Sequence, residues 1–207
     1  MTITDQFIAS LASFSPEFGL TLSPEQVTQC GRHYELLLKW NRHCNLTRIT
    51  APAEAARWHF CESLFAARFL AVSAGIADLG SGAGFPGIPL AIVLPQLPIK
   101  LVEINQKKVF FLREAIRSLG LTNTEVLAAR FQAVDLGGLT CVVRAIEQFQ
   151  TNLGGLFASA GVRQILLFAG EKIGRELENY QSWEIEAVPI PLAKNRWLFC
   201  ARRRCST

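Results

Sequence analysis

The chain has 207 residues, half of them apolar, and a formal net charge of +4, which is enough for one sizeable core and leans toward an anionic partner. The N-terminus has an early acidic residue and no basic region, which argues against a secretory signal, and no apolar run is long enough to span a membrane. The six cysteines form no Cys-x-x-Cys pair and have no metal-ligand spacing, so we expect a cytoplasmic protein with reduced, mostly buried thiols and no metal.

A helical pattern extends over the first 72 residues. Residues 23–26 form a helix start, with serine as the N-cap, proline at the first helical position and glutamine closing a capping box. The helix that follows is expected to end near Asn41, and a second long helix is expected over residues 53–70. We therefore predict that residues 1–72 form a helical segment packed on the rest of the chain.

The pattern changes after residue 72, where short β-rich runs alternate with helical stretches. The runs are residues 76–79, 99–104, 124–129, 141–145 and 164–169. This alternation predicts an α/β fold over residues 73–207, with a mostly parallel sheet and helices on both faces. Two further strands, residues 183–190 and 196–203, follow each other without a helix and are expected to form an antiparallel hairpin at the sheet edge.

The clearest helix of this second part begins at Asn105, a predicted N-cap, and stops at Gly120. One face of this helix is expected to be apolar, with Phe110, Phe111, Ala115 and Leu119.

A glycine-rich turn, ADLGSGAGFPG at residues 77–87, follows the first predicted strand. Ligands of open α/β sheets bind at the carboxyl ends of strands, and the first strand-to-helix turn is the usual place. Residues 82–87 match the dinucleotide pattern GxGxxG, but the first glycine after the strand is Gly80, so the phase is wrong for that pattern. Pro86 and Pro89 also remove two backbone donors that a diphosphate would use.

These features favour a ligand without phosphate, such as S-adenosylmethionine. Glu103, at the end of the second strand, is suited to accept hydrogen bonds from both ribose hydroxyls of such a ligand. Together with Asp78 and the alternating Gly80, Gly82 and Gly84, it predicts a cofactor site. The alternative is that the glycines only shape a tight turn.

Several motifs occur in order between residues 36 and 170. They are Lys39-Trp40-Asn41 with Asn45-Leu46-Thr47, His59 before Glu62-Ser63-Leu64, DLGSGAGFPGIPLAI, LVEINQKKVFFL, Arg130, and Arg144-Ala145. This series resembles the bacterial 16S ribosomal RNA guanine-N7 methyltransferases, the glucose-inhibited division protein B (RsmG) family. The resemblance implies a Rossmann-like methyltransferase sheet with an N-terminal helical extension, and S-adenosylmethionine as cofactor.

The resemblance also implies roles for individual residues. Cofactor contacts are expected from Gly80, Phe85, Glu103, Phe131 and Gln132, with Glu103 on the ribose and Phe131 and Gln132 along the adenine. Arg144, at the carboxyl end of its strand, is expected to be catalytic, lining the cleft between cofactor and RNA. A purely structural ion pair is the alternative for Arg144.

The chain departs from the family pattern at four positions. They are Glu62, Gln132, Leu139 and Ala169, where the family usually has aspartate, glutamate, aspartate and lysine. We expect these departures to affect site details and turnover more than the fold.

The chemistry expected for guanine N7 needs no general base, because N7 is a ring nitrogen with a free lone pair and needs only alignment with the methyl group. One rival is a cytosine-C5 methyltransferase that uses Cys141, although Cys141 is expected to begin its strand, away from the site. The other rivals are an NAD-dependent reductase and a non-catalytic RNA-binding module.

The RNA partner, 16S ribosomal RNA or the small subunit, is expected to meet basic residues of a monomer. Our candidates for RNA binding are Arg42 and Arg48, with Asn41 and Asn45 on the same helical face unless they cap the helix end. Trp40 and Trp58 lie in the same segment, and we expect both in the core rather than as stacking surfaces for bases.

Overall fold

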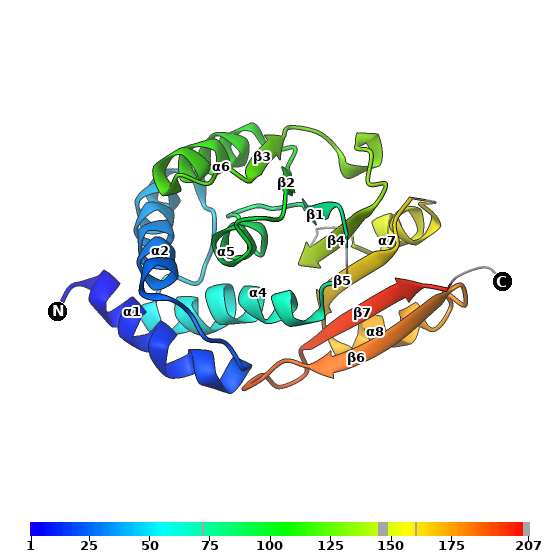
Figure 1. The fold of residues 1–207 in the computed structure, drawn as a ribbon, viewed down its shortest axis with the longest axis horizontal. Helices are drawn as coiled ribbons and strands as arrows, with labels where there is room; N and C mark the ends of the chain where they lie inside the picture. Colours follow the sequence, from blue (N-terminus) through cyan, green and yellow to red (C-terminus); the bar gives the residue numbers. More distant parts are fainter. Residues whose placement is uncertain (72, 145–148, 160, 205–207) are drawn as a thin grey trace.

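The computed structural model describes residues 1–71, 73–144, 149–159 and 161–204 (Figure 1). A seven-stranded sheet with the order β3-β2-β1-β4-β5-β7-β6 forms its centre. The strands from β3 to β5 are parallel, and β7 and β6 continue the sheet as an antiparallel hairpin at one edge. The predicted α/β class, the parallel sheet and the edge hairpin are therefore confirmed.

The strands lie close to the predicted runs. They are β1 (Gly75–Leu79), β2 (Ile99–Val102), β3 (Thr124–Leu127), β4 (Leu139–Arg144), β5 (Gln164–Ala169), β6 (Trp183–Pro189) and β7 (Trp197–Arg203). All of β1 and nearly all of β4 and β5 are buried, because helices cover both faces of the sheet centre. Val72, at the expected segment boundary, Ala145, at the expected end of the fourth strand, and Cys205 lie outside the described residues.

The N-terminal part is helical, as predicted. It comprises α1 (Ile3–Phe14), η1 (Ser15–Phe18), α2 (Pro24–Cys44), α3 (Pro52–Ala55), η2 (Ala56–Cys61), α4 (Glu62–Phe65) and η3 (Ala66–Phe69). The capping box at the start of α2 is present, since Ser23 and Gln26 exchange side-chain and backbone hydrogen bonds. The expected end of this helix near Asn41 is wrong. The helix continues to Cys44 and ends there, because Asn45 adopts a left-handed conformation.

The helices after β1 are α5 (Gly87–Val93), α6 (Gln106–Leu119), α7 (Phe149–Ala158) and α8 (Glu171–Leu177), with a short turn η4 (Phe131–Ala133). Asn105 caps α6 and Gly120 ends it in a left-handed conformation, as predicted. The expectation for Phe110 is wrong: its side chain is 59% exposed, whereas Phe111 is buried. Adjacent helical residues point about 100° apart, so only one of this pair can face the core.

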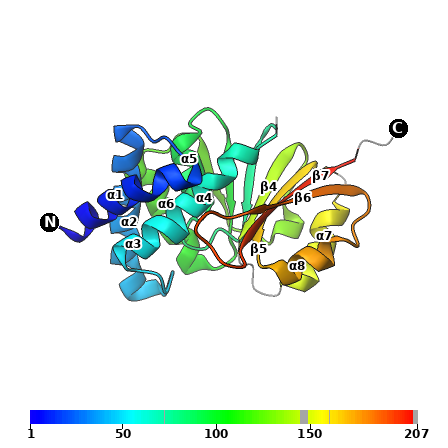
Figure 2. The same cartoon turned by 90° about the horizontal axis from the view of Figure 1, so that it is seen from below.

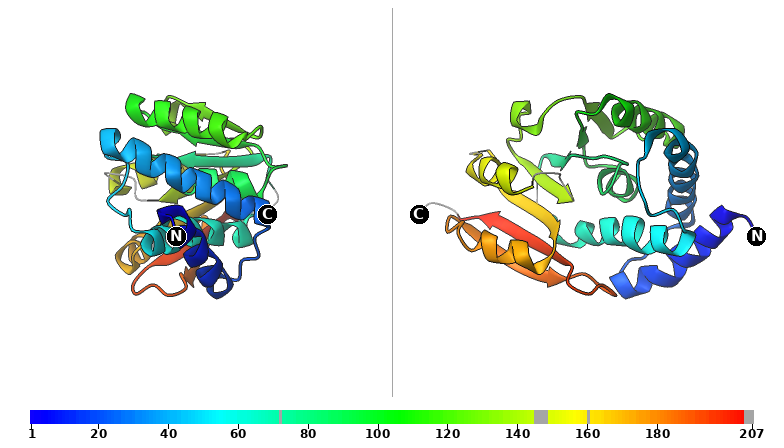
Figure 3. Two further views of the ribbon diagram at one scale, coloured as in Figure 1. Left: turned by 90° about the vertical axis from the view of Figure 1, so that its left-hand side faces the viewer. Right: turned by 180° about the vertical axis from the view of Figure 1, so that it is seen from behind.

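The helices form two layers. The N-terminal helices, α5 and α6 cover one face of the sheet, and α7 and α8 cover the other (Figure 2). The N-terminal helices lie across one end of the molecule, where α2 contacts both α5 and α6 (Figure 3). Phe7, Phe60 and Phe111 share one core cluster with Ile76 of β1, so the N-terminal segment and the sheet bury a common apolar surface.

Gln164 of β5 joins the two parts of the chain through its buried side-chain amide. Its Nε2 donates to the Phe69 carbonyl at 2.7 Å, and its Oε1 accepts from the Ala71 amide at 2.8 Å and from the Thr140 hydroxyl at 3.0 Å. This amide therefore fixes the end of the helical segment against the sheet.

The five cysteines among the described residues are unpaired thiols, and four of them are buried. The expectation of reduced, mostly buried thiols is confirmed for this part of the chain. None of the described helices combines the length and apolarity needed to cross a membrane.

Candidate active site

The turn between β1 and α5 is held against the carboxyl end of β2. The backbone amides of Gly80 and Ser81 both donate to the carbonyl of Val102, at 2.8 and 3.1 Å. Gly80, Gly82 and Gly84 have φ angles of 74°, 57° and 83°, which side-chain-bearing residues rarely adopt. The alternating glycines are thus required by the path of the turn. Gly80 and Gly82 also leave its backbone accessible to a close ligand, whereas Gly84 is buried against Ile88.

Asp78 lies beneath this turn and is fully buried. Its Oδ2 accepts a hydrogen bond from the Gly87 amide at 2.9 Å, and its Oδ1 has no partner among the described residues. Burial raises the pKa of this carboxyl to about 7, although the Gly87 amide opposes the shift. Asp78 therefore joins the end of β1 to the start of α5. Because its side chain lies beneath the turn, we expect Asp78 to influence a bound cofactor by holding the turn in place.

Glu103 follows β2 and faces the turn, with 7% of the residue exposed. Its Oε2 accepts from the Gly82 amide at 3.0 Å, and its Oε1 accepts from the amides of Ile104 and Asn105 at 2.9 and 2.8 Å. Each carboxylate oxygen can accept two hydrogen bonds, so Oε2 retains a lone pair for a ligand hydroxyl. The residue predicted to hold the ribose is thus fixed in place by backbone amides on both sides.

Phe131 and Gln132 lie in η4, which follows β3 at the same edge of the sheet. β3 pairs with β2, and the Glu103 amide donates to the carbonyl of Leu127, the last residue of β3. Phe131 is half-buried and Gln132 exposed, and both line a small cavity of about 280 Å³ against α7. The structure therefore brings the glycine turn, Glu103 and the predicted adenine contacts to one edge.

Phe85 points away from that edge, into the contact with the N-terminal helices. Its ring stacks on His59 with centroids 4.6 Å apart, and it also packs on His33 and Phe60. The residue is nearly fully buried, so its ring is not presented to the cofactor edge, and a cofactor contact by Phe85 stays a prediction.

Arg144 ends β4 beside the turn, since its neighbour Val143 pairs with Leu79. Its Nη1 donates to the Trp58 carbonyl at 3.0 Å, its Nη2 lies 3.3 Å from Nδ1 of His59, and its guanidinium carbon is 5.2 Å from the centre of the Phe85 ring. Arg144 thus makes the contacts expected of a structural residue, which was the alternative to a catalytic role. Its position at the strand end also suits a role beside the cofactor.

Glu62 is the carboxylate nearest to Arg144 in the described structure, and it is fully buried. Its Oε1 lies 2.5 Å from Nη2 of Arg196 and 3.9 Å from Nη1 of Arg144. Burial raises the pKa of Glu62, while the two arginines oppose this shift. Sequence reasoning missed Arg196, because nothing local to the start of β7 shows which buried acid its guanidinium meets.

Comparison with known proteins shows the family to which the chain belongs. The family described as "GidB: rRNA small subunit methyltransferase G" matches residues 26–184. The chain belongs to this family.

Relatives within the rRNA small subunit methyltransferase G family support the assignment. A protein of this name from Xylella fastidiosa (strain 9a5c) is 51% identical over 180 residues, covering 82% of this chain and 83% of that protein. Another from Solibacter usitatus is 40% identical over 176 residues, covering 80% and 83%. Other relatives match over 49–62% of their own length.

A solved structure shows the same fold at low identity. It is M. capricolum TrmK in complex with S-adenosyl-homocysteine, with a TM-score of 0.54, 15% identity, and coverage of 68% of this chain and 66% of that chain. The predicted Rossmann-like methyltransferase fold is therefore confirmed.

The family motif around His59 contributes to a buried aromatic cluster that also contains His33. His33 is fully buried between Phe60, Phe85 and Phe111, and neither ring nitrogen has a hydrogen-bond partner within the described chain. Burial lowers the pKa of His33 to about 3, and the backbone at Ala83 offsets part of this effect. His33 is therefore neutral in the folded protein at neutral pH.

We expect the substitution His33→Leu to make the protein less sensitive to acid. The unfolded state gains a proton on His33 below the ordinary histidine pKa of 6.5, and the folded state does so only near 3, so the wild type loses stability as pH falls below about 6.5. At pH 5 this loss is about 2 kcal/mol relative to pH 8. His59 and Asp78 titrate in both proteins, so their effects cancel in the difference.

Urea unfolding of both proteins at pH 8 and pH 5 measures this effect. The stability of the His33→Leu variant relative to wild type should rise by about 2 kcal/mol at the lower pH. An unchanged difference between the two pH values would show that His33 is protonated in the folded state.

The asparagines of the family motif close the loop after α2. Asn41 donates from Nδ2 to the Thr47 carbonyl at 2.9 Å and accepts from the Thr47 amide at 2.8 Å, and Asn45 ends the helix. The capping alternative therefore holds for Asn45, whereas Asn41 lies inside the last turn of α2 and bonds to the loop that follows. Arg42 and Arg48 are exposed beside this loop, and RNA contact by all four residues stays a prediction.

The two tryptophans of the N-terminal segment differ in their surroundings. Trp40 packs on Phe111 and the main core, which confirms the expectation for this residue. Trp58 is half-buried but belongs to neither core cluster, so the same expectation is wrong for Trp58. Its ring lies instead beside two guanidinium groups.

Cys141 lies inside β4, two residues after the strand begins at Leu139, and not at its start as expected. It is fully buried, pairs with Ala77 and Ile165 in the sheet, and burial raises the pKa of its thiol to about 12. A thiol in this state is a poor nucleophile, which argues against the cysteine mechanism.

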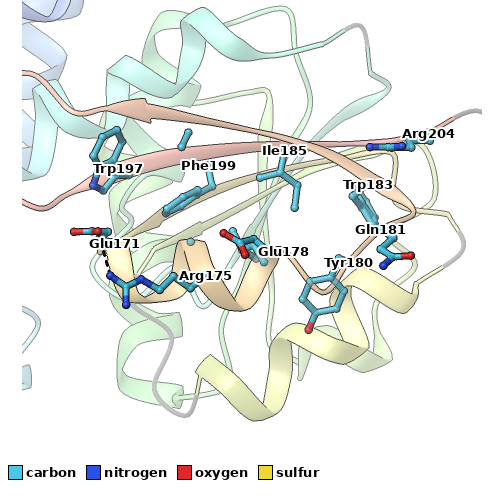
Figure 4. Close-up of a pocket in the computed structure, with 13 residues that line it drawn as sticks. Glu171, Arg175, Glu178, Tyr180, Gln181, Trp183, Ile185, Trp197, Phe199 and Arg204 are labelled. Carbon is cyan, nitrogen blue, oxygen red and sulfur yellow. Dashed lines mark ion pairs between the residues drawn. The ribbon is translucent and has the colours of Figure 1, made fainter.

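A groove of about 740 Å³ lies elsewhere, between α8 and the β6–β7 hairpin (Figure 4). Trp183, Ile185, Trp197 and Phe199 form its floor, and Glu178, which caps the C-terminal end of α8, lies opposite them. None of the predicted site residues lines this groove, so the family motifs and this groove are separate features.

Proposed function

We propose that the protein transfers the methyl group of S-adenosylmethionine to N7 of a guanine in 16S ribosomal RNA, in the cytoplasm. Its membership of the rRNA small subunit methyltransferase G family carries this proposal. The geometry supports it, since the glycine turn, Glu103 and η4 meet at the carboxyl edge of the sheet, where open α/β folds bind ligands.

The cofactor fits the residues at this edge. The free lone pair on Oε2 of Glu103 can accept a ribose hydroxyl, and the backbone of Gly80 and Gly82 allows a close approach. Pro86 precedes α5 and Pro89 lies in its first turn, so the helix start lacks two amides that a diphosphate would need. S-adenosylmethionine supplies an electrophilic methyl group on a sulfonium, and the chain supplies binding and alignment.

Alignment is sufficient for attack by guanine N7. The described part of the chain has no exposed histidine or carboxylate pair at this edge, and His59 is buried with its pKa lowered to about 3. Arg144 and Glu62 lie next to the turn as a buried, charged group, and they join the N-terminal helices to the end of β4. This is the arrangement expected when positioning, and not proton transfer, limits the reaction.

Methyl transfer from labelled S-adenosylmethionine to small ribosomal subunits tests this proposal. We expect incorporation into 16S RNA and, after mapping of the labelled base, N7-methylguanine at a single position. Label in protein, in cytosine, or in no component of the subunit would contradict the proposal.

We expect Glu103→Ala to weaken binding of S-adenosylmethionine by about 1.5–3 kcal/mol, the range for a hydrogen bond to a charged group. Glu103→Gln is the matched control, because it keeps the shape and one acceptor but loses the charge, and it should fall between alanine and wild type. Calorimetry measures both affinities, and NAD should not bind any of the three proteins. Wild-type affinity in a folded alanine variant would contradict the ribose assignment.

We expect RNA binding to weaken steeply with salt if Arg42 and Arg48 contact phosphates. Replacing both with glutamine should reduce the slope of log affinity against log salt by about 1.4, at about 0.7 per phosphate for single strands. The control replaces Lys172 and Arg175 of α8, two exposed cations on the other face of the sheet, and should leave the slope unchanged. Equal slopes for both double variants would place the RNA surface elsewhere.

A further inference from the structure

We propose that Trp58 is a stacking surface for an unpaired base of the RNA substrate, with Arg57 and Arg196 contacting the adjacent phosphates. This inference rests on the proposed function, and it adds the part of the site that meets the nucleic acid.

Trp58 lies at the edge of the sheet that carries the cofactor turn. Its carbonyl accepts the 3.0 Å hydrogen bond from Nη1 of Arg144, and Arg144 follows Val143, the β4 partner of Leu79. Gly80, the first residue of the turn, follows Leu79 directly. The backbone of Trp58 is therefore fixed beside the place where the methyl group would be transferred.

The indole ring has the surroundings of a stacking surface and not of a core residue. It is half-buried, belongs to neither core cluster, and has the guanidinium carbon of Arg57 4.0 Å from its centre. The guanidinium carbon of Arg196 lies farther away, at 5.5 Å, on a side chain that is 42% exposed. Aromatic rings and arginine planes are the groups on which proteins stack unpaired RNA bases.

The charge around Trp58 favours an anionic partner. The guanidinium groups of three residues lie close to Trp58: Arg57, Arg144 and Arg196. Among the described residues, Glu62 alone brings a carboxylate within 4 Å of these groups. Nε of Arg57 is buried without a hydrogen-bond partner among the described residues. A polynucleotide would supply both a base for the ring and phosphates for the unbalanced positive charge.

A hydrogen bond connects this site to the loop that carries Arg48. Oγ1 of Thr47 lies 2.8 Å from Nε2 of His59, and Thr47 is itself held by Asn41. Arg48 follows Thr47 and Trp58 precedes His59, so this hydrogen bond joins the loop that carries Arg48 to the helical segment that carries Trp58.

Single-turnover methyl transfer at increasing concentrations of small ribosomal subunits tests the role of Trp58. Trp58→Leu should raise the half-saturating concentration by about tenfold or more, the effect of losing one stacked base. Trp58→Phe keeps an aromatic ring and should stay within about threefold of wild type. Trp197→Leu is the matched control, a half-buried tryptophan in the α8 groove, and should match wild type.

Affinity for S-adenosylmethionine should be unchanged in all three variants. A folded Trp58→Leu variant that saturates like wild type would overturn the inference, and so would a Trp58→Phe variant as impaired as Trp58→Leu. The affinity of each variant for the subunits is measured in parallel in a binding assay that needs no methyl transfer. If the wild type binds the subunits but transfers no methyl group, the proposed function is contradicted and the role of Trp58 is still tested by binding.

Photo-crosslinking of the unmutated protein to small-subunit RNA provides a test that does not depend on the folding of a variant. The crosslinked peptides should include the one that contains Trp58. Crosslinks confined to other peptides would overturn the inference.

Discussion

Replacing Arg144 with methionine should reduce single-turnover methyl transfer by at least about 100-fold and lower the free energy of unfolding by about 3 kcal/mol. The guanidinium of Arg144 holds the Trp58 carbonyl, His59 and Glu62 at once. Its loss leaves buried Glu62 with Arg196 alone, and removing one member of a buried ionic group costs about 3–5 kcal/mol. The helical layer would then shift against the turn, and a misplacement of about 1 Å can cost about 100-fold in rate.

Arg144→Lys separates charge from geometry. Lysine keeps the positive charge near Glu62, but its single ammonium group lacks the fork that reaches Trp58 and His59 together. We expect an intermediate stability and a turnover closer to the methionine variant. Urea unfolding and single-turnover assays measure the two effects, and wild-type turnover in a folded methionine variant would make Arg144 a purely structural residue.

Replacing Gly87 with alanine should abolish binding of S-adenosylmethionine and lower the free energy of unfolding by about 3 kcal/mol or more. A Cβ atom at this position would lie 2.6 Å from Oδ2 of Asp78 and would also collide with Cδ2 of Leu101. Both neighbours are buried parts of the sheet, so relief requires α5 to move away from β1 and β2. The turn that carries Gly82 would move with the helix.

Gly155→Ala is the control for this substitution. Gly155 lies within α7, and a Cβ atom there would meet no heavy atom within 4 Å beyond its chain neighbours and the backbone of its own helix. Alanine should therefore stabilise the protein by about 0.5–1 kcal/mol through its higher helix propensity. Thermal or urea unfolding compares the stabilities of the two variants, and calorimetry measures cofactor binding by Gly87→Ala. A Gly87→Ala protein that binds the cofactor normally would show that the turn tolerates displacement.

Local sequence signals predicted the parts of the fold that depend on neighbouring residues. The capping box at residues 23–26, the cap at Asn105 and the stop at Gly120 all involve contacts within a few positions, and all three are present. The glycine turn and Glu103 were predictable for a similar reason, because strand ends in a parallel sheet meet at one edge.

Long-range partners were not predictable in the same way. The sequence places Arg144 at a strand end, but it does not show that the side chain turns toward Trp58 and Glu62, which are about 80 residues away along the chain. The ion pair between Glu62 and Arg196 joins residues that are farther apart still. The two arginines beside Trp58 follow from these tertiary contacts, so the usual burial of tryptophan suggested a core residue instead.

The sheet ends at β6, and no other strand of the described chain pairs with the outer edge of β6. Such an edge presents backbone amides and carbonyls with which a second copy of the chain could pair. β6 carries exposed Glu184 and Glu186 and ends at Pro189. Two copies meeting edge to edge would bring like charges together and lack one backbone donor per strand, which opposes self-association through this edge and is consistent with the expected monomer.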